Sequence, residues 1–301
     1  MDIGIGLPST VPATTGLQLT GWAREADARG FSSLGTIDRI VYPNYEPLIA
    51  LSAAAAVTER IRLATTILIA PLRLNAALLA KQAASLDALS GGRLTLGLAV
   101  GGREDDFEAS DASFGDRGAR FDAQLEEMKR IWAGEERGFA GAIGPSAVTD
   151  GGPTLIIGGH AHVAIRRAAR FGDGWILGGG APDQFTSLAV GLDEAWVDEG
   201  RDGRPRKMAI AYFSLGPDAA ETADRYLNHY YAFAGEETAG AIAGSAATSE
   251  EMVRGYASAF EQAGCHELIF FPCSSDRGQV RLLADAVGRT GVARESPGVT
   301  V

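Results

Sequence analysis

Residues Ile61–Gly102 read IRLATTILIAPLRLNAALLAKQAASLDALSGGRLTLGLAVGG, and this stretch decides the fold. It contains two apolar runs, Ile61–Ala70 and Arg93–Val100, with the length and composition of buried strands. Between them Asn75–Leu89 has the pattern of an amphipathic helix, and the Ser-Gly-Gly sequence at 90–92 is a stop signal after it. The stretch therefore predicts a strand–helix–strand unit of a parallel sheet.

The same alternation extends over the rest of the chain in both directions. The other predicted strands are Asp2–Pro8, Ser32–Ile37, Pro153–Gly158, Asp173–Gly178, Lys207–Leu215 and His266–Pro272. The other predicted helices are Leu17–Arg29, Glu46–Thr58, Arg117–Ala133, His162–Phe171, Pro182–Glu199, Asp218–Phe233, Ser249–Ala263 and Arg277–Arg289. Eight strand–helix units predict an α/β protein, a single (β/α)8 TIM barrel that forms one domain over residues 1–301. The Gly- and Ala-rich stretches 134–152 and 234–248 are predicted loops.

The composition excludes several classes of protein. With 27 Lys and Arg against 38 Asp and Glu, the net charge of −11 argues against binding to nucleic acid or to an anionic membrane. Cys265 and Cys273 form no disulfide framework, and no Cys/His spacing predicts a metal site. The amino-terminal residues lack the basic and apolar regions of a signal peptide, so we expect a cytoplasmic protein.

Common catalytic motifs are missing from the sequence. It contains no P-loop, no G-x-S-x-G, no H-E-x-x-H and no G-x-G-x-x-G pattern. The three lysines lie on predicted helices or at the start of a strand, so a Schiff-base aldolase has no evident nucleophile. A glycosidase with paired carboxylates drawn from Asp38, Glu46 and the acidic run 104–106 stays an alternative.

Glycine clusters follow three of the predicted strands. They are Gly101-Gly102, Gly158-Gly159 and Gly178-Gly179-Gly180, all at the carboxyl ends, where a barrel carries its chemistry. Glycine lets a ligand approach the backbone closely, and a following helix offers free N–H groups to a phosphate. The alternative is that these turns need glycine only for a positive φ angle.

The chain resembles the bacterial luciferase-like family of flavin-dependent oxidoreductases. The features in common are the strand end P-L-R at 71–73, the segment AKQAASLDALSGGR, and the strand LGLAVG. The opening IGIGLP, the segment RGARFDAQLEEMKRIW, and LIIGG followed by AARFGDGW extend the resemblance over nearly the whole chain. It implies a (β/α)8 barrel, in agreement with the strands counted independently.

The resemblance also implies a cofactor and its site. We expect noncovalent FMN, or the deazaflavin F420 that one branch of the family uses, at the carboxyl end of the barrel. The ring would lie on Thr65, Thr66 and Ile67, where relatives often have a bulge with a non-prolyl cis peptide. The phosphate and its surroundings would be bound by Gly101, Gly158, Gly159, His160, Gly178, Gly179 and Gly180.

Two departures from the family bear on activity. Many relatives place a histidine after the acidic residue that ends strand two, whereas this chain has Asp38 followed by Arg39, our two catalytic candidates. A guanidinium does not exchange protons as imidazole does, but it can hold an anionic substrate or a reduced flavin anion. We expect loss of Arg39 to lower activity and to leave stability nearly unchanged, with Asp38 or Glu46 as its partner if it is structural. Ala181 and Pro182 stand near the position of a lysine of the deazaflavin branch, which weakens that alternative.

The predicted function is that of a flavin-dependent oxidoreductase, a monooxygenase that uses reduced FMN and oxygen on a small organic substrate. Tyr42, Tyr45 and Arg73 are candidates for the substrate pocket. A separate flavin reductase would be a partner of an FMN-dependent enzyme, and members of the family commonly form homodimers. The alternatives are F420-dependent hydride transfer and a catalytically inactive binding protein.

Overall fold

A computed structural model describes residues 1–289 of the chain. The strands are β1 (Asp2–Gly6), β2 (Ser33–Thr36), β3 (Arg62–Thr65), β4 (Leu68–Ile69), β5 (Leu94–Ala99), β6 (Thr154–Gly158), β7 (Gly174–Leu177), β8 (Arg206–Phe213) and β9 (Glu267–Pro272). All their pairings are parallel, in the order β3-β2-β1-β9-β8-β7-β6-β5-β4, and β3 also pairs with β5. The sheet therefore closes into an eight-stranded barrel, since β3 and β4 are two parts of one barrel strand. The predicted (β/α)8 fold is confirmed.

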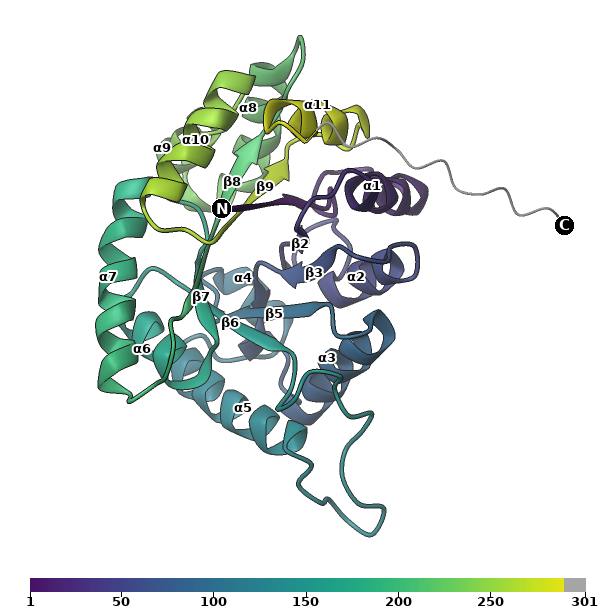
Figure 1. Cartoon of the computed structure of the whole chain (residues 1–301), viewed down its shortest axis with the longest axis vertical. Coiled ribbons are helices and arrows are strands. Elements are labelled where there is room, and N and C mark those ends of the chain that lie inside the picture. The colour runs from purple at the N-terminus through teal and green to yellow at the C-terminus, as the bar shows by residue number, and fades with distance from the viewer. Residues whose placement is uncertain (290–301) are drawn as a thin grey trace, which may run out of the picture.

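Helices connect the strands, and most of them surround the barrel on its outside, while the short helix after β5 lies within the ring of strands in the view of Figure 1. They are α1 (Gly16–Ala28), α2 (Pro47–Ala55), α3 (Ala76–Ser90), α4 (Glu104–Ala109), α5 (Arg117–Trp132), α6 (His162–Phe171), α7 (Pro182–Asp198), α8 (Ala219–Tyr230), α9 (Glu236–Gly244), α10 (Glu250–Gln262) and α11 (Gly278–Ala286), with 3₁₀ turns at Ala70–Leu72 and Ala232–Ala234. None of the helices within residues 1–289 combines the length and apolar character that crossing a membrane requires. The predicted single domain extends to residue 301, so its last part lies outside the described residues.

The third barrel strand is interrupted, so the prediction of one strand over Ile61–Ala70 is wrong. Ala64 pairs with Thr95 and Leu68 pairs with Leu98, so four steps along this strand match three steps along β5. One extra residue is a β-bulge, which breaks the ladder and bends the strand. The peptide bond between Thr66 and Ile67 is cis, as the resemblance implies.

The structure contains two helices that were not predicted. The predicted loop 234–248 includes α9, where Glu236 and Glu237 occupy the first turn and the methyl groups of Ala239 and Ala243 are buried. Acidic residues at a helix start and alanines on the buried face favour a helix, and its packing against α8 stabilises it. The short helix α4, which no sequence pattern predicted, follows β5. The stretch 134–152, by contrast, has neither a helix nor a strand, as predicted.

Apolar side chains fill two layers. The outer layer lies between the strands and the helices and includes Trp22, Phe121 and Trp175. The inner layer lies within the barrel, where the Phe271 ring occupies the space left by Gly6, since a Cβ there would overlap that ring. The inner layer continues into a group of tyrosines, Tyr212, Tyr226 and Tyr230, so the carboxyl end of the barrel has an aromatic lining.

A buried carboxylate joins the amino ends of four strands. Glu267 of β9 lies 2.6 Å from Arg206 of β8 and 3.3 Å from Arg62 of β3, and accepts hydrogen bonds from the hydroxyls of Ser32 and Ser33 at the start of β2. Burial acts to raise the pKa of Glu267, but Arg62, the serine hydroxyls and Arg206 outweigh it and hold that pKa below its ordinary value. These contacts stabilise the closed barrel at the end opposite to the predicted site.

Candidate functional site

A cavity of about 570 Å³ lies at the carboxyl end of the barrel. It is formed by the loops after β6 and β7, by β8, and by helices α9 and α10. Its lining includes His160, the turn Gly178–Gly180, Tyr212 and Tyr231. The volume is in the range of small-molecule sites, and the lining combines apolar rings with a few polar groups.

The glycine turn after β7 is open toward this cavity. A Cβ at Gly178 or Gly179 would meet no atom within 4 Å. The turn leads into the 17-residue helix α7, whose N-cap residue Ala181 makes no side-chain capping hydrogen bond. The first N–H groups of a helix need acceptors, and an anion such as phosphate supplies them. The turn and the helix start therefore form a suitable phosphate site.

His160 also lines the cavity, from the loop after β6. Its Nδ1 lies 3.3 Å from Nε2 of Gln184, which belongs to α7. Burial lowers the pKa of His160, so its imidazole is neutral at pH 7. A neutral ring can donate or accept a hydrogen bond beside a bound ligand.

Three other predicted cofactor residues do not line this cavity. A Cβ at Gly158 would lie 2.5 Å from Cδ1 of Ile67, and one at Gly159 would lie 2.6 Å from Cβ of Ala164. At Gly101 a Cβ would lie 2.6 Å from Cγ2 of Ile69. Close packing accounts for all three glycines. Gly101 and Gly159 also have positive φ angles of 76° and 145°, which is the alternative reason expected from the sequence, whereas Gly158 does not.

The predicted ring-binding residues differ in their exposure. Thr65 and Thr66 are buried, and their hydroxyls donate to the carbonyl oxygens of Gly97 and Thr36. These hydroxyls are therefore engaged by the barrel backbone. Ile67 retains exposed surface and packs in the same apolar cluster as Tyr212, which lines the cavity. The bulge thus presents Ile67, rather than the threonines, to the carboxyl end.

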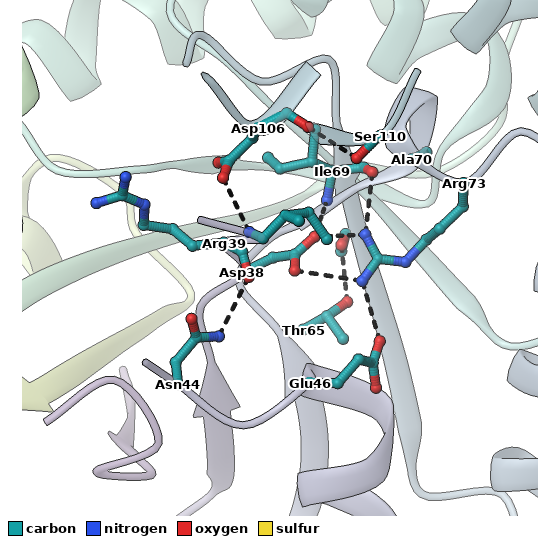
Figure 2. A network of polar contacts seen from close by, with 12 residues as sticks. Asp38, Arg39, Asn44, Glu46, Thr65, Ile69, Ala70, Arg73, Asp106 and Ser110 are labelled. Atoms are coloured by element: carbon teal, nitrogen blue, oxygen red, sulfur yellow. Dashed lines mark hydrogen bonds and ion pairs between the residues drawn. The ribbon is translucent and has the colours of Figure 1, made fainter. Parts of the chain in front are cut away.

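Asp38 takes part in a buried ion network (Figure 2). Its carboxylate lies 2.6 and 3.2 Å from the two terminal nitrogens of Arg73 and accepts a hydrogen bond from the N–H of Ile69 at 2.8 Å. Arg73 also pairs with Glu46 at 3.0 Å. Burial raises the pKa of the Asp38 carboxyl, and Arg73 and Ile69 act against that rise. Asp38 and Arg73 therefore link β2 to the segment after the bulge, and Asp38 is not paired with Arg39.

Arg39 points away from Asp38 (Figure 2). Its guanidinium lies 3.2 Å from Asp105 of α4 and donates to the carbonyl oxygen of Tyr230 at 3.3 Å. It also lies 5.0 Å from the ring centroid of Tyr42. The expected partners Asp38 and Glu46 are thus wrong, because the partner is Asp105. Arg39 is 8% exposed and paired, so the structure favours some loss of stability on its replacement, where the sequence alone suggested little change.

The two candidate tyrosines lie in different places. Tyr42 packs edge to face on Tyr230, with ring centroids 5.0 Å apart, and its hydroxyl is 2.9 Å from Nδ1 of His229. Tyr45 donates its hydroxyl hydrogen bond to the carbonyl oxygen of Thr14 and lines a separate small pocket with Ser9. The structure therefore brings Tyr42, but not Tyr45, into the aromatic lining of the barrel end.

Residues that sequence reasoning missed complete this lining. Arg103, directly after the Gly101-Gly102 pair, lies 4.4 Å from the ring centroid of Phe233 and 5.2 Å from that of Tyr230. Tyr231 hydrogen-bonds to the hydroxyl of Tyr212 at 2.7 Å. The signal available in the sequence was the group Tyr230, Tyr231 and Phe233 at the end of a predicted helix. No three His, Cys, Asp or Glu side chains within residues 1–289 are arranged to hold a metal ion.

Comparison with known families identifies this barrel. The family described as luciferase-like monooxygenase matches residues 1–292. The chain belongs to the luciferase-like monooxygenase family. One relative is Rv0940c, an uncharacterized protein of Mycobacterium tuberculosis (strain ATCC 25618 / H37Rv), which is 35% identical over 207 residues that cover 60% of this chain and 71% of the relative.

Solved structures share the luciferase-like fold. Monooxygenase RslO1 from Streptomyces bottropensis has a TM-score of 0.79 and 23% identity, covering 95% of this chain and 98% of its own. An F420-dependent secondary alcohol dehydrogenase bound to an F420–acetone adduct has a TM-score of 0.77 and 16% identity over 98% and 99% of the chains. The oxygenating constituent of 3,6-diketocamphane monooxygenase from Pseudomonas putida, in complex with FMN, has a TM-score of 0.74 and 16% identity over 97% and 98%. Luciferase-like enzymes thus include flavin monooxygenases and F420-dependent oxidoreductases.

Proposed function

We propose that this luciferase-like protein is a flavin-dependent monooxygenase that uses reduced FMN and oxygen on a small organic substrate. The observation that carries the proposal is the open turn Gly178–Gly180, which lines the cavity beside the uncapped start of α7. This arrangement suits the phosphate of a flavin nucleotide. A separate flavin reductase would supply the reduced cofactor.

The chain's own residues have separate tasks in this proposal. Pro182 has no N–H and the N–H of Gly179 donates to Leu177, so the N–H groups of Gly178, Gly180 and the second and third residues of α7 would hold the phosphate. The neutral His160 would donate a further hydrogen bond to it. Ile67 and the bulge would support the ring. Tyr212 and Tyr231 would exclude water from the reacting atoms by their apolar surface. When bound, the flavin supplies the redox chemistry.

F420-dependent hydride transfer is the second candidate. It is supported by the likeness to the F420-dependent alcohol dehydrogenase, whose fold covers nearly the whole chain. The same turn and helix start would accept the phosphate of either cofactor. Ala181 and Pro182, in place of a lysine, favour FMN. A protein that binds a ligand without turnover is the third candidate, because Arg39 replaces the histidine of many relatives.

Titration of the purified protein with FMN and with F420, followed by fluorescence, separates the candidates. Binding of FMN, together with oxygen uptake on addition of a reductase, supports the monooxygenase. Binding of F420 alone supports hydride transfer. Binding of neither cofactor contradicts both enzymatic proposals.

The variant Gly178→Val tests the phosphate site. Gly178 lies in open space and has no positive φ, so the fold should tolerate a side chain that blocks the approach to the backbone. We expect FMN to bind at least tenfold more weakly, equivalent to about 1.4 kcal/mol. The control is Gly191→Val, within α7 and outside the cavity lining. A Cβ at Gly191 also meets no atom within 4 Å. Equal affinities in the two variants would contradict this site.

A further inference from the structure

Two arginines share one pair of aromatic rings at the carboxyl end of the barrel. The guanidinium carbon of Arg103 lies 4.4 Å from the ring centroid of Phe233 and 5.2 Å from that of Tyr230. That of Arg39 lies 5.4 and 5.7 Å from the same two centroids. The first arginine follows β5 and the second follows β2, so the barrel closure brings together two cations that are distant in sequence.

The positive charge of this pair is poorly compensated. Arg39 pairs with Asp105, whose side chain is 44% exposed and therefore screened by water. Arg103 is half-buried and lies within ion-pair distance of no carboxylate in the described range 1–289; its side chain contacts the Tyr230 hydroxyl and the rings of Tyr230 and Phe233. The Nε atoms of both arginines are buried without a partner. The nearby Asp106 carboxylate attracts Arg103 without forming an ion pair with it, and its Oδ1 accepts the N–H groups of residues 40 and 41 at 2.9 and 2.7 Å.

Buried guanidinium groups with unused donors require an acceptor. Arginine keeps its charge at every relevant pH, so the cost of burial is not relieved by loss of a proton. Stacking on aromatic rings offsets part of that cost and leaves the N–H edges free. Those edges match the two oxygens of a carboxylate or phosphate in a planar, bidentate contact.

We propose that Arg103, together with Arg39, binds an anionic group of the substrate, a carboxylate or a phosphate. This inference rests on the proposed function, because that function is what makes the bound anion a substrate. Tyr231 connects the two regions, since it lines the cavity and its ring lies 5.0 Å from Tyr230 and 6.0 Å from Phe233. A molecule with an apolar body in the cavity can thus direct its acidic group to Arg103. The cofactor phosphate has its own site at the turn 178–180.

Calorimetric titration with sodium benzoate tests the site in the purified protein without added cofactor. Benzamide, which has the same ring but no charge, is the matched probe. We expect benzoate to bind the unmodified chain, benzamide to bind much more weakly, and Arg103→Gln to weaken benzoate binding at least tenfold. The control is Arg170→Gln, which removes an arginine that stacks on Phe171 at 4.6 Å on the outer helix α6. Equal benzoate binding in Arg103→Gln and the unmodified chain would overturn the inference, as would equal weakening in both variants.

The fold of each variant is checked by thermal unfolding. Arg103→Gln removes the stacking on Phe233 and Tyr230, so we expect a small fall in the melting temperature, and a single cooperative transition shows that the variant is folded. Arg103→Lys, which restores a point charge without the planar fork, should recover only part of the benzoate affinity. Full recovery would mean that charge alone is recognised and would overturn the bidentate contact.

Titration of the same variants with FMN distinguishes a substrate site from a cofactor site. We expect Arg103→Gln to bind FMN as the unmodified chain does. A loss of FMN affinity with unchanged benzoate binding would assign the arginines to the cofactor and overturn the inference. If neither FMN nor F420 binds while benzoate binding depends on Arg103, the anion site is supported and the proposed oxidoreductase fails instead.

Discussion

At the scale of single residues, the Asp38–Arg73 pair connects two strands through a bidentate contact. Arg73 is largely buried, and its pKa is raised above the ordinary value because the pairing with Asp38 and Glu46 outweighs burial, which acts to lower it. Its charge is balanced by Asp38, which is 1% exposed, and by the half-exposed Glu46. The position of the segment after the bulge depends on the same pair, since Asp38 also accepts the N–H of Ile69.

Replacing Asp38 by Asn should destabilise the protein by about 3 kcal/mol, because a buried guanidinium loses its principal counter-charge. The matched variant is Glu46→Gln, which removes the other carboxylate on Arg73. Since Glu46 is exposed to water, that change should cost less than about 1 kcal/mol. Urea unfolding of the two variants at pH 7 measures both values. Similar losses of unfolding free energy in the two variants would show that the buried Asp38 contributes no more than the exposed Glu46, and would contradict this prediction.

At the scale of elements, Glu267 holds the amino ends of the barrel strands together. Its carboxylate contacts residues of β2, β3 and β8 while it belongs to β9. A carboxyl whose pKa is lower in the folded than in the unfolded protein stabilises the fold above its unfolded pKa, and this stabilisation is lost as the pH falls through the folded pKa. Glu267 therefore contributes at neutral pH and less in acid.

We expect Glu267→Gln to lose about 3 kcal/mol of the free energy of unfolding at neutral pH, because Arg62 and Arg206 would retain only Asp2. The difference between the unmodified protein and the variant should shrink as the pH falls below about 4.3, the ordinary pKa of glutamate. Urea unfolding at pH 7, 5, 4 and 3 gives this difference, because the loss begins near the unfolded pKa and continues through the lower pKa of the folded protein. A difference independent of pH would attribute the loss to packing rather than charge. The control is Glu135→Gln, which removes an ion pair with Arg130 at the end of α5 whose two side chains are both in contact with water; it should have little effect at any pH.

At the scale of the whole molecule, cofactor binding and folding are linked. A ligand that binds only the folded chain stabilises it by about 2.7 kcal/mol at 100 times its dissociation constant. For a barrel of this size, with an unfolding entropy of about 2.1 cal/mol/K per residue, the melting temperature should rise by about 4 °C.

Calorimetry with FMN, F420 and riboflavin tests this linkage and the phosphate site together. Riboflavin has the ring of FMN without its phosphate, so at equal concentration it should raise the melting temperature less than FMN. Equal shifts for FMN and riboflavin would mean that the phosphate is not bound by the turn 178–180 and the start of α7. An unchanged melting temperature with every cofactor would contradict the proposed oxidoreductase.

The sequence by itself determined the barrel, because its evidence is local. Alternating apolar runs and amphipathic helices, with glycine stop signals between them, require no knowledge of distant contacts. The motifs in Ile61–Gly102 also indicated the family and the bulge near Thr66. The predicted loop over 234–248 failed because its weak apolar pattern becomes a helix only when α8 covers it.

Only the tertiary structure decided which polar groups meet. Asp38 and Arg39 are adjacent, which made a pair between them plausible, but neighbouring side chains of an extended segment point to opposite sides. The partner of Asp38 is 35 residues away, and the partners of Arg39 are 66 and 191 residues away. No local pattern in the sequence pointed to Arg103. Its proposed role depends on the aromatic rings that it contacts and on the absence of an ion-pair partner within residues 1–289. Barrel closure creates both conditions, so the candidate anion site could be recognised only in the folded protein.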